Sequence, residues 1–339
     1  MQGGLLPEGD KITLSDWIDR YLEEYAKPSV RVKSYDKYES CLAYVKKSFL
    51  GAITLGKLRN SMIQRFINNL LLSGGIKGKS LSSSTVRATR QYLGMALNQA
   101  VRDGLIQRNV AKDTKPPKLV KEEIHPLDAK QVNKLLVVAQ EYGDIAHMVI
   151  MIALNTGMRL GEIFGLKWDC VDLKTNMIYV RRQLVTSKKG SLFQPPKTKA
   201  SRRRILLPTH LVVAIVSYKA WQDQHKIKLG DLYQENNLVI TNGLGKVYDT
   251  SNFTSRVFKQ MLKNAEVEQH FKFHDLRHTH ATMLLMGGVN PKVVQERLGH
   301  SSIKMTLDTY GHLMPDMQSS AADALDKMFG LEKTKDDDQ

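Results

Sequence analysis

The 339-residue chain has only two cysteines, no long apolar run and far fewer acidic than basic side chains. Cys41 and Cys170 lie far apart in the sequence, so free thiols are expected rather than a disulfide or a metal site. No apolar stretch reaches the roughly 18 residues that a membrane-spanning helix needs. The first residues, MQGGLLPEGD, lack the charged and apolar regions of a signal peptide, so we expect a cytoplasmic protein.

The shortage of acidic residues is the strongest signal in the composition. Lysine and arginine total 50 and aspartate and glutamate total 34, which gives a formal net charge of +16. An excess of this size indicates a polyanionic partner, with nucleic acid favoured over an anionic membrane surface. The 42% hydrophobic content is ordinary for a globular protein, and the length suffices for two domains.

The first third of the chain predicts a helical domain over residues 13–108, after an N-terminal tail of residues 1–12. Helices are predicted across residues 13–26, 33–49, 60–72 and 84–101 from the spacing of their apolar side chains. On the last of these helices, Arg87 and Arg90 fall outside the apolar side, where they form either a solvated face or a nucleic-acid contact. Residues 109–128 are rich in proline and lysine and predict an interdomain linker.

The rest of the chain predicts a second domain, residues 129–314, that is mainly helical with a small antiparallel β-sheet. Strand character occurs in MIYVRRQLV (177–185) and RRRILLP (202–208), with a long basic turn region between them. Helices are predicted across residues 129–142, 144–156, 159–166, 209–229 and 250–265, before short helical stretches with Gly or Pro breaks. A C-terminal helix over residues 315–331 carries its apolar residues along one stripe, and residues 332–339 form a tail.

Several polar residues of the second domain suit phosphate chemistry. Arg159 precedes a predicted helix and Glu162 shares its face, as either a surface ion pair or part of a phosphate site. His274 and Arg277 also share a helical face, whereas His274 with His278 alternatively has the spacing of zinc ligands. Cleavage of a phosphodiester without a metal needs cations on the phosphate, a nucleophile such as tyrosine, and a general acid.

One ordered set of residues meets these needs and carries a family resemblance. The set is Arg159, Lys197, His274, Arg277, His300 and Tyr310. Its segments, TGMRLGE, PPKTKASRRRILLP, HDLRHTHAT and LGHSSIKMTLDTYGHL, closely resemble the tyrosine recombinase (phage integrase) family. The resemblance covers nearly the whole chain and is nearest to integrases of conjugative transposons and Gram-positive phages. Those relatives commonly carry an additional N-terminal arm-binding domain, for which this length leaves no room.

The resemblance implies a site-specific recombinase that cleaves and rejoins DNA to integrate or excise a mobile element. Tyr310 would attack the scissile phosphate and form a 3′-phosphotyrosyl link, on a short mobile segment rather than in a core. Arg159 and Arg277 would clamp that phosphate, and Lys197 would be the mobile general acid, with Lys199 as the competing lysine.

The resemblance implies supporting and DNA-binding roles for other polar residues. His274 would hydrogen-bond the phosphate and assist as a general base, His300 would hydrogen-bond a non-bridging oxygen, and Glu162 would support its neighbours. The expected DNA-binding residues are Arg87, Arg90, Lys199 and Arg202. His278, His280 and His312 match no catalytic position and are expected in the core or on the surface.

The resemblance also implies the assembly. The helical core-binding domain and the catalytic domain would form a clamp on double-stranded DNA, and a homo-tetramer would join two attachment sites. The C-terminal helix would dock on a neighbouring protomer, although packing on its own domain is the alternative. DNA-bending accessory proteins are further expected partners, the bacterial nucleoid is the expected location, and neither a cofactor, a metal nor a membrane is implied.

Three other functions compete with recombination. A zinc enzyme is disfavoured because the His274–His278 pair lacks the glutamate and third ligand of such sites. A non-catalytic DNA-binding regulator would be expected to lose one of the catalytic residues, and all are present. A type IB topoisomerase shares the chemistry but relaxes DNA without strand exchange.

Overall fold

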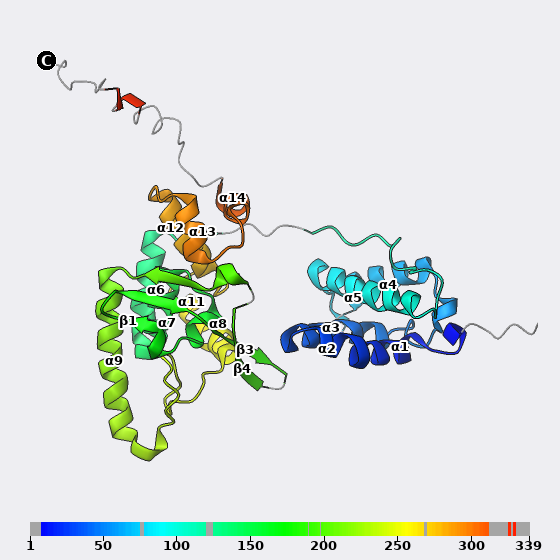
Figure 1. Ribbon diagram of the computed structural model, residues 1–339, viewed down its shortest axis with the longest axis horizontal. Helices are drawn as coiled ribbons and strands as arrows, with labels where there is room; N and C mark the ends of the chain where they lie inside the picture. Colours follow the sequence, from blue (N-terminus) through cyan, green and yellow to red (C-terminus); the bar gives the residue numbers. More distant parts are fainter. Residues whose placement is uncertain are drawn as a thin grey trace, which may run out of the picture. The chain divides into compact units, whose positions relative to one another are not determined.

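The computed structural model describes residues 8–74, 78–119, 125–188, 190–196, 198–267 and 270–311, with residues 325, 326, 328 and 329. The chain divides into two compact units, Met1–Glu123 with Ser187–Lys189 and Ile124–Thr186 with Gly190–Gln339. The predicted fold class, mainly helical with a small antiparallel sheet, is confirmed (Figure 1). Among the described residues, no helix combines the length and the apolarity needed to cross a membrane.

The first unit is a bundle of helices around one core. Its α-helices are α1 (Leu14–Tyr21), α2 (Lys27–Ser29), α3 (Val32–Lys46), α4 (Asn60–Ser73) and α5 (Ser83–Arg102). Thr13 caps α1 by accepting a hydrogen bond from the backbone N–H of Asp16. Trp17 is buried, and its indole N–H donates to the carbonyl of Ala96 on α5 at 2.9 Å. A π-helical turn, Leu22–Ala26, follows α1, so the predicted helix across 13–26 is not regular throughout.

The second unit combines helices with two small sheets. Its α-helices are α6 (Ala129–Glu141), α7 (Asp144–Thr156), α8 (Leu160–Phe164), α9 (Thr209–Leu229), α10 (Thr250–Asn252), α11 (Lys259–Asn264), α12 (Asp275–Met286), α13 (Pro291–Leu298) and α14 (Ile303–Tyr310). Its strands are β1 (Val171–Asp172), β2 (Met177–Val180), β3 (Gln183–Ser187), β4 (Gly190–Gln194) and β5 (Arg203–Leu206). The apolar face of α7 is almost wholly buried, which makes this helix the centre of the core.

The strands form two small sheets. β1, β2 and β5 make an antiparallel sheet in which Val180 pairs with Arg203 at one end, and β3 pairs with β4 in the other sheet. The stretch 177–185, predicted to have strand character, is divided between β2 and β3, which belong to different sheets. Because β5 begins at Arg203, the ladder has no further partner for the chain beyond Val180, and the chain leaves this sheet. The hairpin of β3 and β4 begins within the first predicted strand segment and continues into the predicted basic turn region.

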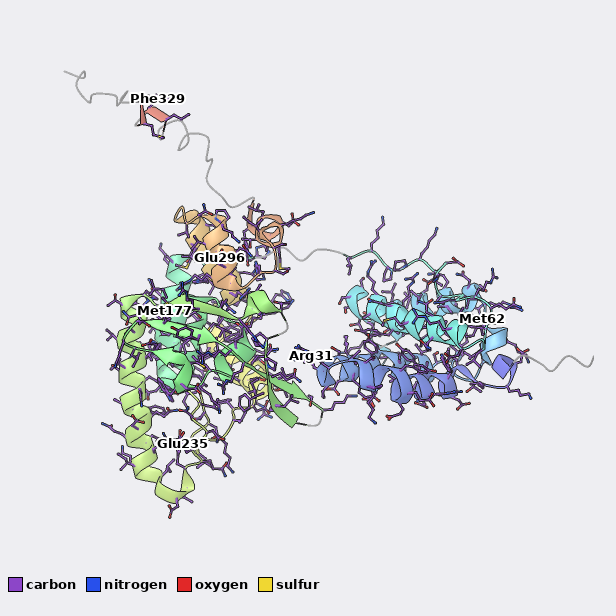
Figure 2. All side chains as sticks on the ribbon, viewed as in Figure 1. Arg31, Met62, Met177, Glu235, Glu296 and Phe329 are labelled. Carbon is purple, nitrogen blue, oxygen red and sulfur yellow. The ribbon has the colours of Figure 1, made fainter. Side chains whose placement is uncertain are left out.

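The last helices of the second unit pack together. α12, α13 and α14 lie side by side at one end of the unit (Figure 1). Their shared apolar cluster consists of Ala281, Leu285, Val294, Leu298 and Tyr310. Figure 2 marks the outer side of α13 by Glu296 and the sheet by Met177 on β2. These helices and the residues that flank them include His274, Arg277, His300 and Tyr310, four of the six residues predicted for catalysis.

Candidate active site

A buried carboxylate stands at the centre of the candidate site. Glu162 is 2% exposed, and its Oε1 accepts a hydrogen bond from Arg159 Nη1 at 2.9 Å. Arg203 on β5 donates to both oxygens of Glu162, at 3.2 and 3.0 Å. Burial alone would raise the pKa of Glu162, but Arg203 and Arg159 outweigh it and hold that pKa below its usual value. Glu162 is thus an ionised anchor that orients Arg159, which stays partly exposed.

Arg277 is held by backbone carbonyls instead of a carboxylate. It is 2% exposed, and its Nη1 and Nη2 donate to Gly157 O at 2.7 Å and to Leu298 O at 2.8 Å. Burial lowers the pKa of Arg277 to about 9, and the positive charges of Arg159 and Arg203 add to this effect. The guanidinium remains charged at neutral pH, so the site holds positive charge that an anion would stabilise.

Two glycines allow close packing of the elements that carry the site, at the end of α7 and at the end of α13. Gly157 ends α7 at a positive φ of 62°, and a Cβ there would lie 2.7 Å from the rings and methyls of His280 and Leu298. Gly299 ends α13 at φ 70°, and a Cβ there would lie 2.9 Å from the carbonyl of Ala200. A side chain would therefore be strained at both positions, which explains the TGMR and LGH segments in physical terms.

The histidines predicted for catalysis lie around this centre. His300 follows α13, and its Nδ1 lies 2.9 Å from the hydroxyl of Thr306. Burial, together with the charges of Arg277 and Arg159, lowers the pKa of His300 to about 4. Partial desolvation and the charges of its neighbours also lower the pKa of His274 to about 4, and this exposed residue immediately precedes α12. Both rings are therefore neutral at pH 7 and can each donate one N–H to an anion.

Tyr310 is placed differently from the expectation. It is 1% exposed and fills the apolar cluster of α12, α13 and α14, so the expectation that it avoids a core is wrong. Tyr310 and Thr306 lie four residues apart on the buried face of α14, which explains this burial. Its hydroxyl lies 2.6 Å from Nδ1 of His278. Burial raises the pKa of Tyr310 to about 12, against an opposing effect of Arg277.

The sequence analysis did not assign Arg203, Arg297 or His278 to the site. Arg203 also donates from Nε to the carbonyl of Arg297 at 2.6 Å, which ties β5 to the end of α13. Arg297 in turn donates to Nε2 of His280 at 3.2 Å, and His280 Nδ1 lies 2.7 Å from Leu154 O. His280 is buried, as expected, whereas His278 contacts the predicted nucleophile. The alternation of the apolar Ile205 and Leu207, within and directly after β5, was the available signal that Arg203 points inward.

The basic turn is only partly described. Lys197 lies outside the described residues, as do His312 and most of residues 315–331. Lys199 begins a short 3-10 helix, Lys199–Ser201, that leads into β5. Arg202 is exposed beside the inward Arg203. The turn is therefore continuous in sequence with Arg203, which binds the Glu162 carboxylate. The segment that contains the predicted general acid is in this way linked to Glu162.

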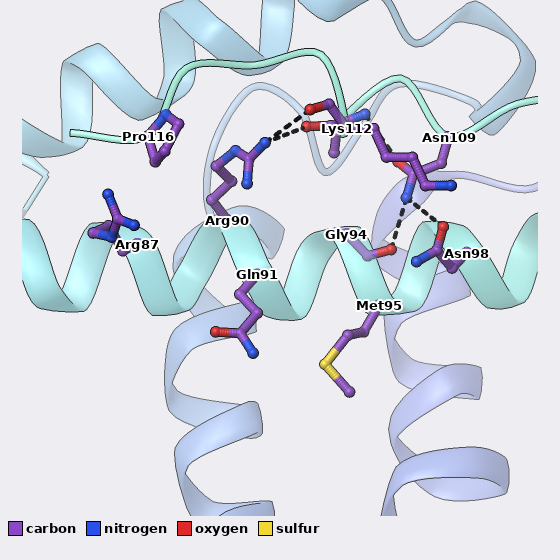
Figure 3. Close-up of a pocket in the computed structure, with 10 residues that line it drawn as sticks. Arg87, Arg90, Gln91, Gly94, Met95, Asn98, Asn109, Lys112 and Pro116 are labelled. Carbon is purple, nitrogen blue, oxygen red and sulfur yellow. Dashed lines mark hydrogen bonds between the residues drawn. The ribbon is translucent and has the colours of Figure 1, made fainter. Parts of the chain in front are cut away.

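The predicted DNA-binding arginines of α5 are engaged with the chain that follows. Arg90 donates from Nε to the Thr114 hydroxyl at 2.7 Å and from Nη2 to the carbonyls of Ala111, Lys112 and Thr114. Arg87 Nη1 donates to Pro117 O at 2.7 Å. Both line a groove of about 500 Å³ along α5 (Figure 3). The first part of the predicted linker is thus fastened to α5.

Within the described residues, no group of three His, Cys, Asp or Glu side chains is placed to hold a metal ion. The candidate site instead concentrates cationic and neutral donors. Its members are Arg159, Arg203, Arg277, His274, His278 and His300, around Glu162 and Tyr310. This composition suits a singly charged phosphodiester, whose non-bridging oxygens accept hydrogen bonds from guanidinium and imidazole.

Known proteins share this sequence and fold. Residues 125–317 match the phage integrase family and residues 13–116 match the phage integrase SAM-like domain. A tyrosine recombinase XerC-like protein of Caldanaerobacter subterraneus subsp. tengcongensis is 30% identical, over 97% of this chain and 86% of that protein. The Tn1549 transposon integrase in complex with a circular intermediate DNA has a TM-score of 0.75 at 21% identity, covering 94% of this chain and 99% of that one.

A further solved structure with this fold is the lambda integrase tetramer bound to a Holliday junction. Its TM-score is 0.63 at 21% identity, covering 91% of this chain and 78% of that one. The predicted resemblance to tyrosine recombinases and transposon integrases is therefore confirmed.

Proposed function

The chain belongs to the phage integrase family and is a tyrosine site-specific recombinase, and we propose that Tyr310 is its nucleophile. Such an enzyme integrates or excises a mobile element by cutting and rejoining DNA strands. One observation carries the assignment of Tyr310. Its phenol lies against α12, within the electrostatic influence of the buried Arg277, in a site otherwise rich in cations and imidazoles.

The proposed reaction needs no cofactor. The phenolic oxygen of Tyr310 attacks the scissile phosphorus, and the bond to the 5′ oxygen breaks. The leaving oxygen takes a proton from Lys197, and the products are a 3′-phosphotyrosyl link and a free 5′-hydroxyl. Because the new link is itself a phosphodiester, a 5′-hydroxyl can attack it to rejoin the strand without ATP.

The remaining side chains stabilise charge on the phosphate. Arg159 and Arg277 neutralise the non-bridging oxygens, whose negative charge rises in the pentacoordinate state. His274 and His300 donate hydrogen bonds to the same oxygens. Glu162 keeps Arg159 in position and supplies no proton, since its pairing with the arginines keeps it ionised.

The proposed partner is double-stranded DNA at an attachment site. Residues 13–108 are proposed as the core-binding domain, joined by the linker 109–128 to the catalytic domain 129–314. The proposed contacts to the DNA backbone are Arg87, Arg90, Lys199 and Arg202. Arg90 would combine such a contact with its hold on residues 111–114.

The proposed active form is a homo-tetramer on two attachment sites, in the bacterial nucleoid and assisted by DNA-bending proteins. The C-terminal helix, residues 315–331, would dock on a neighbouring protomer. Support comes from exposed apolar side chains on α12, α13 and α14, which include Met283, Val293 and Met305. The lambda integrase tetramer, which shares the fold, shows an assembly of that size on DNA.

Recombination between two sites on a supercoiled plasmid tests the function. The plasmid carries two copies of the junction sequence of the element that encodes the chain, and the reaction contains a metal chelator. Recombinant circles are the expected product. Relaxation alone would indicate a topoisomerase, tight binding without any strand cleavage would indicate a regulator, and loss of activity with chelator would indicate a metalloenzyme.

A further inference from the structure

Two side chains from different helices meet at the predicted nucleophile. The hydroxyl of Tyr310 on α14 lies 2.6 Å from Nδ1 of His278 on α12, and the ring centroids are 5.6 Å apart. The residues are 32 positions apart in the sequence, so tertiary structure alone creates the contact. Among the described residues, this is the hydrogen bond that the Tyr310 hydroxyl makes.

The chemistry of the pair sets the direction of this hydrogen bond. A phenol is a stronger hydrogen-bond donor than a neutral imidazole, and an imidazole nitrogen is a stronger acceptor than a phenolic oxygen. Burial lowers the pKa of the His278 imidazole and raises that of the Tyr310 phenol, so both groups are neutral. The favoured arrangement places the proton on the Tyr310 oxygen, directed at the lone pair of Nδ1, with the imidazole proton on Nε2.

One helix, α12, carries both His278 and Arg277, which is proposed to bind the phosphate. His278 directly follows Arg277, whose guanidinium is held by Gly157 O and Leu298 O. The ring of Tyr310 is packed against Leu298 and its apolar neighbours. Hydrogen bonds and packing therefore restrict the nucleophile, the imidazole and the arginine together, as proton transfer in a transition state requires.

We propose that His278 is a further catalytic residue, the general base that accepts the phenolic proton of Tyr310 during strand cleavage. The proposal rests on Tyr310 as the nucleophile. It assigns to His278 the base role that the family resemblance implies for His274, whose ring centroid lies 5.0 Å from that of His278. Among the described contacts, His274 makes no hydrogen bond to Tyr310.

The proton balance is complete in both directions. In cleavage, the bond from the Tyr310 oxygen to phosphorus forms, the phenolic proton moves to Nδ1 of His278, and the 5′ oxygen leaves with a proton from Lys197. In rejoining, the 5′-hydroxyl attacks, returns its proton to the lysine, and the departing phenolic oxygen takes its proton back from His278. The nearby Asp275 carboxylate favours the imidazolium that forms in between, whereas Arg277 opposes it.

Replacement of the base gives the direct test. His278→Asn keeps a polar atom near the Nδ1 position but cannot take the proton, and His278→Gln does the same near Nε2. We expect either change to slow cleavage of a nicked duplex by about 10²–10⁴-fold, the usual contribution of a general base, with binding to intact duplex retained. His225→Asn is the matched control, because His225 on α9 bonds the carbonyl of Gly243 outside the site.

A more acidic phenol supplies a rescue that a purely structural role would not show. Placing a fluorinated tyrosine at position 310 should restore much of the lost rate in His278→Asn and accelerate the unchanged protein far less. Three results would overturn the proposal. They are cleavage by His278→Asn at the unchanged rate, equal loss of binding and cleavage in both variants, and the absence of rescue by the fluorinated tyrosine. Tyr310→Phe separates the two assignments, since an adduct in that variant would refute the nucleophile itself.

Discussion

At the scale of single residues, the arginines of the candidate site are held in place by different kinds of partner. Arg159 is held by the ionised Glu162 and stays partly exposed, whereas Arg277 is buried and held by neutral carbonyls. A charge-paired arginine and a carbonyl-bound arginine can both turn free N–H groups toward a phosphate. Their planar forks matter as much as their charge, because two donors meet two oxygens.

Replacing either arginine by lysine tests this geometric role. Arg159→Lys or Arg277→Lys keeps a positive charge and loses the bidentate fork, so we expect cleavage to fall by about 10²-fold or more. Binding to intact DNA, measured by gel shift, should change much less. Equal losses of binding and cleavage would make these residues ordinary backbone contacts.

The local pairs of the candidate site are the part of its geometry that the sequence predicts, and the catalytic roles of its residues stay predictions. Arg159 with Glu162 and His274 with Arg277 are local pairs, whose helical spacing predicts their shared face. The contact of His278 with Tyr310 depends on how α12 meets α14, and spacing carries no information about it. A nucleophile that must reach a phosphate predicts a mobile segment for Tyr310, and this expectation conflicts with its burial on α14.

At the scale of elements, β5 links parts of the site that are distant in sequence. Arg203 bonds Glu162 at the start of α8, the carbonyl of Arg297 at the end of α13 and the carbonyl of Ser201 in the basic turn. Of the consecutive arginines in RRRILLP, the strand directs only Arg203 inward, on the face that buries Ile205 and Leu207. The sequence predicted this strand, but the residue predicted to bind DNA there was the exposed Arg202 and not Arg203.

Removal of Arg203 should therefore destabilise the unit. Arg203→Ala leaves the buried Glu162 carboxylate with Arg159 alone, and we expect the free energy of unfolding to fall by about 3 kcal/mol. Chemical denaturation measures this loss. Arg204→Ala, at the exposed neighbouring position on β5, is the control and should cost little. Equal effects of the two changes would show that Arg203 does not anchor the site.

At the scale of the whole molecule, the chain divides into two compact units, and its net charge is +16. The bounds of the core-binding domain, the linker and the catalytic domain stay predictions. Helix positions followed from apolar periodicity, which buried side chains such as Trp17 and Leu93 obey. The split of β2 from β3 did not follow, because strand pairing depends on partners elsewhere in the chain. Assembly depends on surfaces of other protomers and remains a prediction.

The predicted C-terminal helix, residues 315–331, offers a test of assembly. Leu325 is exposed among the described residues, and Leu325→Asp would place a charge in the proposed apolar contact with a neighbour. The variant should bind a single DNA site and fail in synapsis and strand exchange, as sedimentation of the protein with two sites would reveal. Asp326→Asn at the adjacent position is the control. A variant that unfolds would indicate packing on its own domain, and one that still forms the tetrameric complex would refute docking on a neighbour.

The most direct measurement of the central claim is covalent capture on a nicked duplex that carries the attachment site. Cleavage beside the nick releases a short fragment, so the reaction cannot reverse and the adduct accumulates. The unchanged protein should give a band of lower mobility on a denaturing gel, and Tyr310→Phe, which lacks only the phenolic oxygen, should bind the duplex and give no such band. An adduct with Tyr310→Phe, or none with the unchanged protein on a duplex that it binds, would contradict the assignment of Tyr310 as the nucleophile.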